Sequence, residues 1–397
     1  MQPVTVCSRM KGKLDIYILG DYRPGLPDGL AEFNYQTVHL LKDRFNFHFI
    51  EFRFFEEQDY FDEESVDGII IHTFGVFGLS KWSLSGNFRN WVSELPVENI
   101  LFHINHIYNF HNYLVVKLLK RLKIKYIHTP HDTYVYGHEF KNSRSLIKRL
   151  YREIFVYFID KYVLDRATLV HALTNKGVSY LKQITNAPIM VVSNHIHDMN
   201  IDFEPGLIEP KICFIGRNDF LQKGVDRALG GFALFKSRFK GGGVSLVLIG
   251  PSNPSAAKLR DNLIRELGLV KGKDVILEGK VPETKRNQIL QQSKAYIHLS
   301  RFEGFGLSLV QALCAYKPVI VSSQIPISDK ILQYNAGFVI DSDEDVANAL
   351  SAIFSLSQEE YSQMALSARR CYEEEFHPDV IRPKLINLYE TAAYGKK

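Results

Sequence analysis

Short apolar runs alternate with longer amphipathic segments along almost the whole chain. The first run, LDIYILG at 14–20, is followed by a loop rich in glycine and proline and then by a helical pattern from Gly29. We expect strands at 14–20, 47–54, 68–73, 99–104, 124–129, 168–173 and 189–193, and again at 211–216, 244–250, 274–279, 295–300, 318–323 and 337–340. Helix-spaced apolar residues lie between several of these runs. The alternation predicts an α/β fold with parallel, doubly wound sheets.

The length of 397 residues makes two domains the natural division. The segment 194–211 is polar, contains proline and glycine, and has no hydrophobic periodicity. It therefore reads as an interdomain linker. We expect a first domain over about 1–200 and a second over about 207–375.

One stretch of the second half, RFEGFGLSLVQALCAYKP at 301–318, joins an expected strand to an expected helix through a glycine-containing loop. Such a loop exposes backbone N–H groups, and the helix dipole adds partial positive charge, which suits an anion or sugar hydroxyls. Glu303 and Gln311 offer polar side chains there. The alternative is an ordinary turn. The loop before Gly29 has the same geometry but lacks the G-x-G-x-x-G spacing of a dinucleotide site.

Arg217 and Lys223 flank the loop that follows the expected strand 211–216. Two cations near a helix N-terminus suit a pyrophosphate, and charge-assisted contacts of this kind are worth roughly 1.5–3 kcal/mol each. The alternative is a pair of solvated surface cations.

Three histidines of the first half lie at or just beyond strand ends, where parallel sheets collect their ligands. His103 and His106 belong to the end of the expected strand 99–104, and His131 follows 124–129 in the sequence TPHD. A neutral imidazole can donate or accept a hydrogen bond. Core or surface histidines are the alternative. No spacing here is typical of a zinc site.

Composition narrows the classes of partner. A net charge of +4 is too small to indicate nucleic acid, and the four cysteines form no C-x-x-C pair. Cys213 and Cys314 lie in apolar runs, which predicts buried thiols. No signal peptide or bilayer-spanning run is recognisable, so we expect a cytoplasmic protein.

The segment 141–166 carries seven basic and three acidic residues among many aromatics. It could form an amphipathic helix that rests on the inner face of an anionic membrane or grips a lipid-linked acceptor. The alternative is a solvated helix whose aromatics belong to the core.

The motifs together resemble the GT-B glycosyltransferases, most closely the retaining family-4 group. The resemblance rests on GRNDFLQKGVDRAL and EGFGLSLVQALCAYKPVIVS in the second half, and on PDGLAEFNYQTVHLL, HDTY and MVVSNHI in the first. It extends over nearly the whole chain and is more specific in the second half. Gln311 stands where the family carries a second glutamate that binds the ribose hydroxyls of the donor. Tyr316 and Lys317 replace a small residue and glycine, and His195 replaces a glycine.

The resemblance implies two Rossmann-like domains that face each other across a cleft. The first would bind the acceptor, the second would bind the nucleotide-sugar donor, and a C-terminal helix at about 376–397 would cross back to the first. By analogy the catalytic residues are His131, Glu303, Arg217 and Lys223. The donor would contact Gly29, Arg217, Lys223, Glu303, Gly304, Phe305, Gly306, Leu307 and Gln311. His103 and His106 would be acceptor-binding candidates.

The expected activity is transfer of a hexosyl unit, with retention, from a UDP- or GDP-sugar to a saccharide or lipid-linked hydroxyl, in bacterial surface polysaccharide synthesis. We expect no metal, no cofactor and no nucleic-acid partner. Two alternatives are a non-catalytic nucleotide-sugar-binding module, with Gln311 marking lost chemistry, and a nucleotide-sugar epimerase of similar fold.

Overall fold

The computed structural model describes residues 12–22, 29–54, 60–76, 84–131, 146–239 and 242–395. The chain packs into two compact units. The first contains residues up to Leu173, Gly177–Val192 and the C-terminal residues from Arg382, and the second contains Thr174–Lys176 and Ser193–Ile381. The helix α15, Pro378–Tyr394, therefore begins in the second unit and ends in the first.

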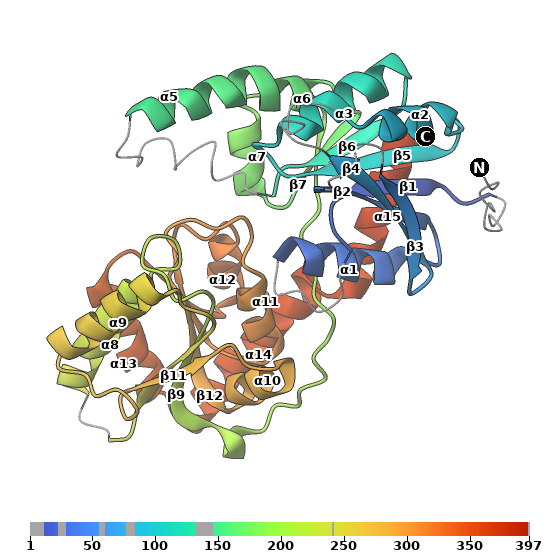
Figure 1. Ribbon diagram of the computed structural model, residues 1–397. Helices are drawn as coiled ribbons and strands as arrows, with labels where there is room; N and C mark the ends of the chain where they lie inside the picture. The colour runs from blue at the N-terminus through green and yellow to red at the C-terminus, as the bar shows by residue number, and fades with distance from the viewer. Residues whose placement is uncertain are drawn as a thin grey trace. The chain divides into compact units, whose positions relative to one another are not determined.

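The first unit is built on an eight-stranded sheet in the order β3-β4-β2-β1-β5-β6-β7-β8 (Figure 1). Its strands are β1 Asp15–Leu19, β2 Asn46–Phe54, β3 Phe61–Val66, β4 Ile69–Val76, β5 Ile100–Asn105, β6 Tyr126–Thr129, β7 Leu169–Ala172 and β8 Ile189–Val191. Every neighbouring pair is parallel except β3 with β4. The parallel α/β prediction is thus confirmed for all strands but one.

The strand β3 has no counterpart among the predicted strands. Its sequence is FDEESV, and Asp62, Glu63 and Glu64 are exposed. The strand lies at the edge of the sheet, so it shows no apolar run, and its charges protect an edge that would otherwise pair with other chains. Hydrophobic patterning cannot detect a strand of this kind.

Helices cover both faces of this sheet. They are α1 Gly29–Leu41, α2 Gly86–Glu94, α3 Phe110–Arg121, α5 Leu146–Phe155, a π-helical turn Val156–Asp160, α6 Lys161–Asp165, α7 Asn175–Leu181 and the end of α15. Figure 1 shows α2, α3 and α6 on one face and α1 and α15 on the other. Arg382 of α15 donates to the Leu40 carbonyl, and Tyr389 packs on Phe45, which attaches the C-terminal helix to the α1 side.

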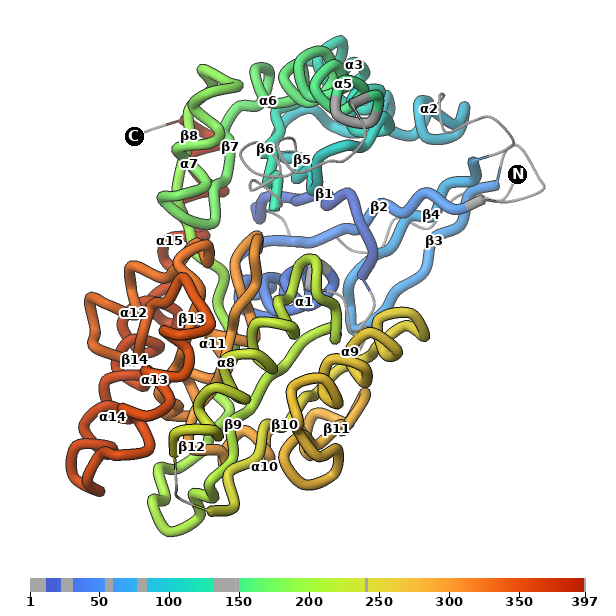
Figure 2. Tube along the Cα trace, turned by 90° about the vertical axis from the view of Figure 1, so that its left-hand side faces the viewer, coloured from blue at the N-terminus to red at the C-terminus, as the bar shows by residue number. Residues whose placement is uncertain are grey.

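The second unit is a six-stranded, fully parallel sheet in the order β11-β10-β9-β12-β13-β14 (Figures 1 and 2). Its strands are β9 Glu209–Ile215, β10 Ser245–Ile249, β11 Val275–Gly279, β12 Ser293–His298, β13 Val319–Ser322 and β14 Gly337–Ile340. Its helices are α8 Val225–Arg238, α9 Pro254–Glu266, α10 Glu283–Gln292, α11 Leu307–Cys314, α12 Ser328–Tyr334, α13 Asp343–Ser355 and α14 Gln358–Glu375. All six strands match predicted apolar runs.

The strand order of this sheet reverses between β9 and β12. From β9 the chain proceeds outward to β10 and β11, and from β12 it proceeds the other way to β13 and β14. The loops after β9 and β12 consequently leave the carboxyl edge side by side, at the switch point where doubly wound sheets bind ligands. The two motifs of the second half occupy these two loops.

The segment predicted as an interdomain linker follows the division between the units and packs on the second unit. Asp198 pairs with Arg369 of α14, the Tyr372 hydroxyl donates to the Ile196 carbonyl, and the backbone N–H of Met199 points to the Cys314 sulfur. Cys213 and Cys314 are free and buried, as predicted.

Candidate functional site

The loops after β9 and β12 are fastened to each other. The backbone N–H of Arg301 donates to the Gln222 carbonyl at 2.8 Å, and its guanidinium binds both carboxylate oxygens of Asp226 in the first turn of α8. Gly224 has a φ of +66°, and a Cβ there would lie 2.3 Å from the Leu299 carbonyl oxygen. Only glycine permits this close approach.

The side chain of Asp219 gives the first loop its shape. One carboxylate oxygen accepts from the backbone N–H groups of Gln222, at 2.8 Å, and Lys223, at 3.1 Å. This local capping is typical of aspartate in turns. The turn sets the direction in which the Lys223 side chain leaves the backbone.

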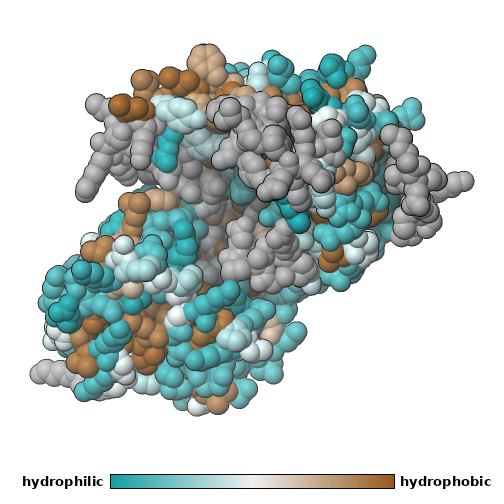
Figure 3. All heavy atoms as spheres, in the orientation of Figure 1, coloured by the Kyte–Doolittle hydropathy of each residue, from teal (hydrophilic) through white to brown (hydrophobic). Residues whose placement is uncertain are grey.

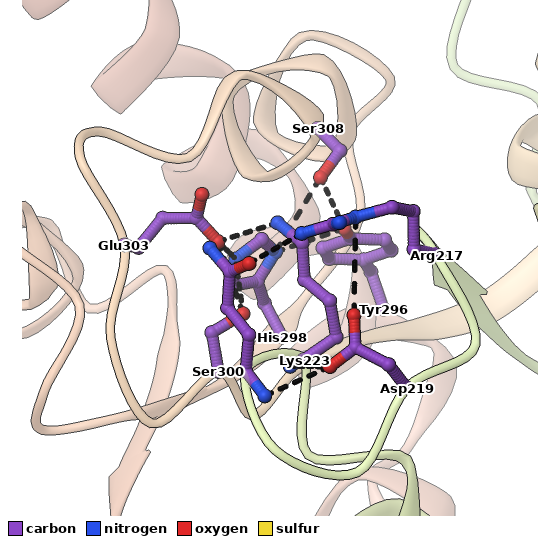
Figure 4. A network of polar contacts seen from close by, with 9 residues as sticks. Arg217, Asp219, Lys223, Tyr296, His298, Ser300, Glu303 and Ser308 are labelled. Carbon is purple, nitrogen blue, oxygen red and sulfur yellow. Dashed lines mark hydrogen bonds and ion pairs between the residues drawn. The ribbon is translucent and has the colours of Figure 1, made fainter. Parts of the chain in front are cut away.

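Arg217, Lys223 and Glu303 converge at this place (Figure 4). The Lys223 ammonium lies 2.7 Å from Oε2 of Glu303, and both side chains are largely buried. Arg217 binds the Gln222 side chain and remains 63% exposed, so its guanidinium can still bind a ligand. The structure thus brings together three residues that were predicted from the sequence, although the first and the last are 86 positions apart.

One oxygen of Glu303 receives all of the hydrogen bonds that this carboxylate makes with described residues. Oε2 lies 2.7 Å from Lys223, 3.0 Å from the Ser300 hydroxyl and 3.2 Å from Nε2 of His298. Burial opposes ionisation of Glu303, but Lys223 and His298 outweigh it and hold the pKa of the carboxyl well below its usual range. Glu303 is an anion whose Oε1 remains available.

The helix α11 starts beside this carboxylate. Gly306 caps it with a φ of +106°, and a Cβ at that residue would meet Glu303 and His298 at 3.9 Å, so conformation rather than space requires glycine. The first backbone N–H groups of the helix have no intrahelical partner and suit an anion. Phe305 is buried against Phe376, so only its backbone can reach a ligand.

The other predicted donor-binding residues lie at the start of a helix or within its first turns. Gly304 and Leu307 are partly exposed around the start of α11, and Gln311 is half-buried one turn further along. Gly29 is the first residue of α1, in the other unit, and the residues just before it lie outside the described ranges. The donor contacts of all of these residues stay predictions.

In the first unit, His131 follows β6 in a left-handed conformation with a φ of +43°. Its Nε2 lies 2.9 Å from Oδ1 of Asn105, and its ring packs edge-on against Phe33 and 5.9 Å from His106. Burial, and then the neighbouring histidines, hold the pKa of His131 well below its usual range. A neutral ring at the carboxyl edge of the sheet is consistent with a role beside a sugar, which stays a prediction.

His103 belongs to a different, fully buried arrangement. Its Nδ1 lies 2.9 Å from the Tyr389 hydroxyl, and its Nε2 lies 2.7 Å from Oγ1 of Thr129. That hydroxyl in turn lies 3.0 Å from Nδ1 of His171, whose Nε2 donates to the Val192 carbonyl. An acceptor would have to displace one of these partners to reach His103, whereas His106 is only half-buried. The acceptor roles of both residues stay predictions.

Sequence reasoning missed several residues of the site in the second unit. Tyr296, His298 and Ser300 lie in or just after β12, and Asp219 and Ser308 lie in the neighbouring loop and helix (Figure 4). The available signal was the alternation of polar side chains in AYIHLS, which turns Tyr296, His298 and Ser300 to one side of the strand. Within the described ranges, no three His, Cys, Asp or Glu side chains are grouped as metal ligands.

Residues 200–370 match the family model described as glycosyl transferases group 1. These residues make up most of the second unit, which is similar to that family. A candidate glycosyltransferase, ORF330, of Acidianus filamentous virus 2 (isolate Italy/Pozzuoli) is 33% identical over an alignment of 114 residues that covers 25% of this chain. The match spans about a third of that viral protein.

Solved structures show a likeness in fold that extends over both units. Sucrose-phosphate synthase from Thermosynechococcus elongatus has a TM-score of 0.71 and 15% identity, with 96% of this chain and 99% of that chain covered. HepE of Anabaena, solved with UDP and glucose, has a TM-score of 0.70 and 15% identity over 95% and 100%. A trehalose-phosphate synthase (UDP-forming) from Burkholderia vietnamiensis has a TM-score of 0.70 and 11% identity over 96% and 99%. The chain has the GT-B fold.

Proposed function

We propose that this protein is a retaining glycosyltransferase that moves a hexosyl unit from a nucleoside diphosphate sugar to a saccharide or lipid-linked hydroxyl. The observation that carries the proposal is the Lys223–Glu303 pair with Arg217 beside it, at the switch point of the unit that is similar to the group 1 family. Cations here would stabilise the charge that develops on the departing diphosphate. Glu303, with Oε1 uncommitted, would accept from the donor sugar.

The nucleotide base is proposed from the structural neighbours. HepE was solved with UDP, and the trehalose-phosphate synthase of Burkholderia vietnamiensis is described as UDP-forming. We propose UDP-sugars as donors ahead of GDP-sugars. A thermal-shift screen with UDP, GDP and their sugars tests this, because a ligand that binds only the folded state raises the unfolding temperature. A shift with GDP alone would reverse the choice.

Turnover is tested by release of nucleoside diphosphate with and without saccharide acceptors. Retention predicts that the anomeric configuration of the donor is preserved in the first-formed product, which proton NMR reports. Binding without turnover on any acceptor would favour a non-catalytic module, and conversion of the donor alone would favour an epimerase. Since Arg217 and Lys223 supply the positive charge, chelation of divalent metals by EDTA should leave the rate unchanged.

We further propose that the acceptor is reached at an anionic membrane surface in the cytoplasm, as in the synthesis of a bacterial surface polysaccharide. An apolar face runs along α5 and the π-helical turn, and Figure 3 shows it as brown atoms at the top of the view. Its members are Ile147, Leu150, Tyr151, Ile154, Tyr157 and Phe158, all exposed. The spacing of three and four residues makes one stripe, and the basic excess of 141–166 suits anionic headgroups. No described helix is long and apolar enough to cross a bilayer.

Sedimentation with vesicles tests this surface. We expect binding to vesicles containing phosphatidylglycerol and weak binding to pure phosphatidylcholine. Ile147→Asp combined with Leu150→Asp should abolish binding, whereas Leu259→Asp, which alters an exposed leucine of α9, should not. Equal binding by all variants would overturn the proposal. The proposal would also be overturned if the protein formed a dimer that the double substitution dissociated, because the apolar face would then bind a second copy of the chain.

A further inference from the structure

We infer that His298 is a positioning residue that, through a relay from Ser308 and Tyr296, directs the free oxygen of Glu303 toward the donor sugar. The inference rests on the proposed function and deepens it, because it concerns how the same site recognises the sugar. Figure 4 shows the four side chains in one network beneath the loop after β12.

Hydrogen-bonding capacity fixes the direction of the bonds that His298 makes in this relay. Glu303 is ionised and can only accept, so Nε2 of His298, 3.2 Å from Oε2, must carry a proton and donate it. Burial lowers the pKa of His298, so the ring is neutral at pH 7 and its Nδ1 is an acceptor. The Tyr296 hydroxyl lies 3.1 Å from Nδ1 and the Ser308 hydroxyl lies 3.5 Å from it, so these two hydroxyls are the donors from which Nδ1 can accept.

The last member of the relay is Ser308. The Tyr296 hydroxyl lies 2.9 Å from the Ser308 hydroxyl and can donate to it, so either hydroxyl can supply the proton that Nδ1 of His298 accepts. Ser308 lies in the first turn of α11 and His298 at the end of β12. The relay therefore couples the ring tautomer of a buried histidine to the start of the helix that would bind the donor phosphate.

The relay matters because of its effect on the two oxygens of Glu303. Lys223, Ser300 and His298 all bind Oε2, and this asymmetry holds the carboxylate in one rotation. Oε1 is then presented to a sugar hydroxyl in a geometry fixed before the sugar arrives. Without the His298 bond, Lys223 and Ser300 could be shared between both oxygens. Preorganisation of this kind is lost when a supporting group is removed, and small misplacements are costly.

Three variants test the inference by turnover. His298→Leu should lower kcat/KM by about 10- to 100-fold, the equivalent of one hydrogen bond to a charged group. His298→Gln keeps an N–H donor at a similar reach and should recover most of that loss. Tyr296→Phe should lower kcat/KM by about 3- to 10-fold in the wild type and have no further effect in His298→Gln, because it acts through the imidazole.

Tyr361→Phe is the matched control for the tyrosine substitution. Tyr361 is also buried in the second unit, and its hydroxyl donates to the Lys294 carbonyl, away from Glu303. It should leave kcat/KM unchanged while costing similar stability. An equal loss in Tyr296→Phe and Tyr361→Phe, or an undiminished effect of Tyr296→Phe in His298→Gln, would overturn the relay.

Ring ¹⁵N NMR separates a failure of the relay from a failure of the proposed function. The His298 signal, assigned by its disappearance in His298→Gln, should report a neutral Nε2–H tautomer in the wild type and a changed signature in Tyr296→Phe. This readout needs no substrate, so it holds even if no nucleotide sugar is turned over. An Nδ1–H tautomer in the wild type would overturn the inference whatever the activity.

Discussion

The two units bury different kinds of polar cluster. The first unit buries an uncharged chain in which Thr129 joins His103 to His171 and every linking nitrogen has a partner within the unit. The second buries a charged cluster in which Lys223 faces Glu303. A neutral chain that satisfies itself stabilises a core, whereas a charged cluster with an uncommitted oxygen can bind a ligand. The comparison therefore distinguishes polar groups that stabilise the core from polar groups that are proposed to bind a ligand.

Acidification should produce the largest difference between the two units. Burial lowers the pKa of His72 and His128 to about 3 and of His171 to about 4, from an ordinary value of 6.5. As pH falls below 6.5, these histidines bind protons in the unfolded state but stay neutral in the folded state. Their contribution to the stability of the folded state is therefore complete above pH 6.5 and is lost as pH falls toward 4. Each can cost about 1.4 kcal/mol per pH unit in that window.

Two carboxyls of the first unit oppose this trend. Burial raises the pKa of Asp160 to about 7 and also raises the pKa of Glu63, so protons on these groups stabilise the folded state as pH falls. The histidines outnumber these carboxyls, and we expect the net stability of the first unit to fall between pH 6.5 and 4. Trp91 belongs to that unit and the sequence of the second unit contains no tryptophan, so tryptophan fluorescence in a urea titration does not report the second unit. An unchanged urea midpoint between pH 7 and pH 5 would contradict the expectation.

The second largest effect is expected on turnover, when the ammonium group of Lys223 is removed from the second unit. Lys223→Ala is expected to lower kcat by about 10²- to 10³-fold, the usual effect of losing one group that stabilises developing charge. Diphosphate release measures the rate, and circular dichroism checks that the fold is retained. The exposed Lys258 of α9 provides a matched Lys→Ala control. Near-normal turnover of Lys223→Ala would remove it from the proposed diphosphate site.

Interruption of the neutral chain should cost stability rather than activity. Thr129→Val keeps the shape of the side chain but removes the hydroxyl between His103 and His171. We expect a loss of about 1–3 kcal/mol in the free energy of unfolding, because buried nitrogens lose their partners. Thr391→Val, on α15, is the control with little expected effect. A stability unchanged by Thr129→Val would show that the chain contributes nothing to the core.

The smallest expected effect concerns Gln311 of α11. Gln311→Glu should tighten binding of the nucleotide by about 10-fold, since a charged acceptor makes stronger hydrogen bonds to ribose hydroxyls than an amide does. Isothermal titration with the preferred nucleoside diphosphate measures the change. Weaker binding would mean that the pocket is built around the amide.

The sequence predicted the frame of the molecule better than its polar interior. Arg217, Lys223 and Glu303 were identifiable because they follow apolar strands in glycine-containing loops, where chemistry is expected. His298 was not, because it lies within a strand that reads as an apolar run, and its partners are brought near it only by folding. The edge strand β3 was not predicted for the opposite reason, because its exposed acidic residues leave no apolar pattern.

The one-sided bonding of Glu303 has a consequence for which sugars the protein can discriminate. With Oε2 saturated, Oε1 is a charged acceptor that only a hydroxyl of the sugar can satisfy. A deoxy analogue that lacks that hydroxyl would leave a buried charge without a partner, and sites of this kind reject such analogues far more strongly than they reject a change in apolar bulk. The arrangement would thus select a substrate by the hydroxyl that must be present, and comparison of deoxy-sugar donors would identify which carbon carries it.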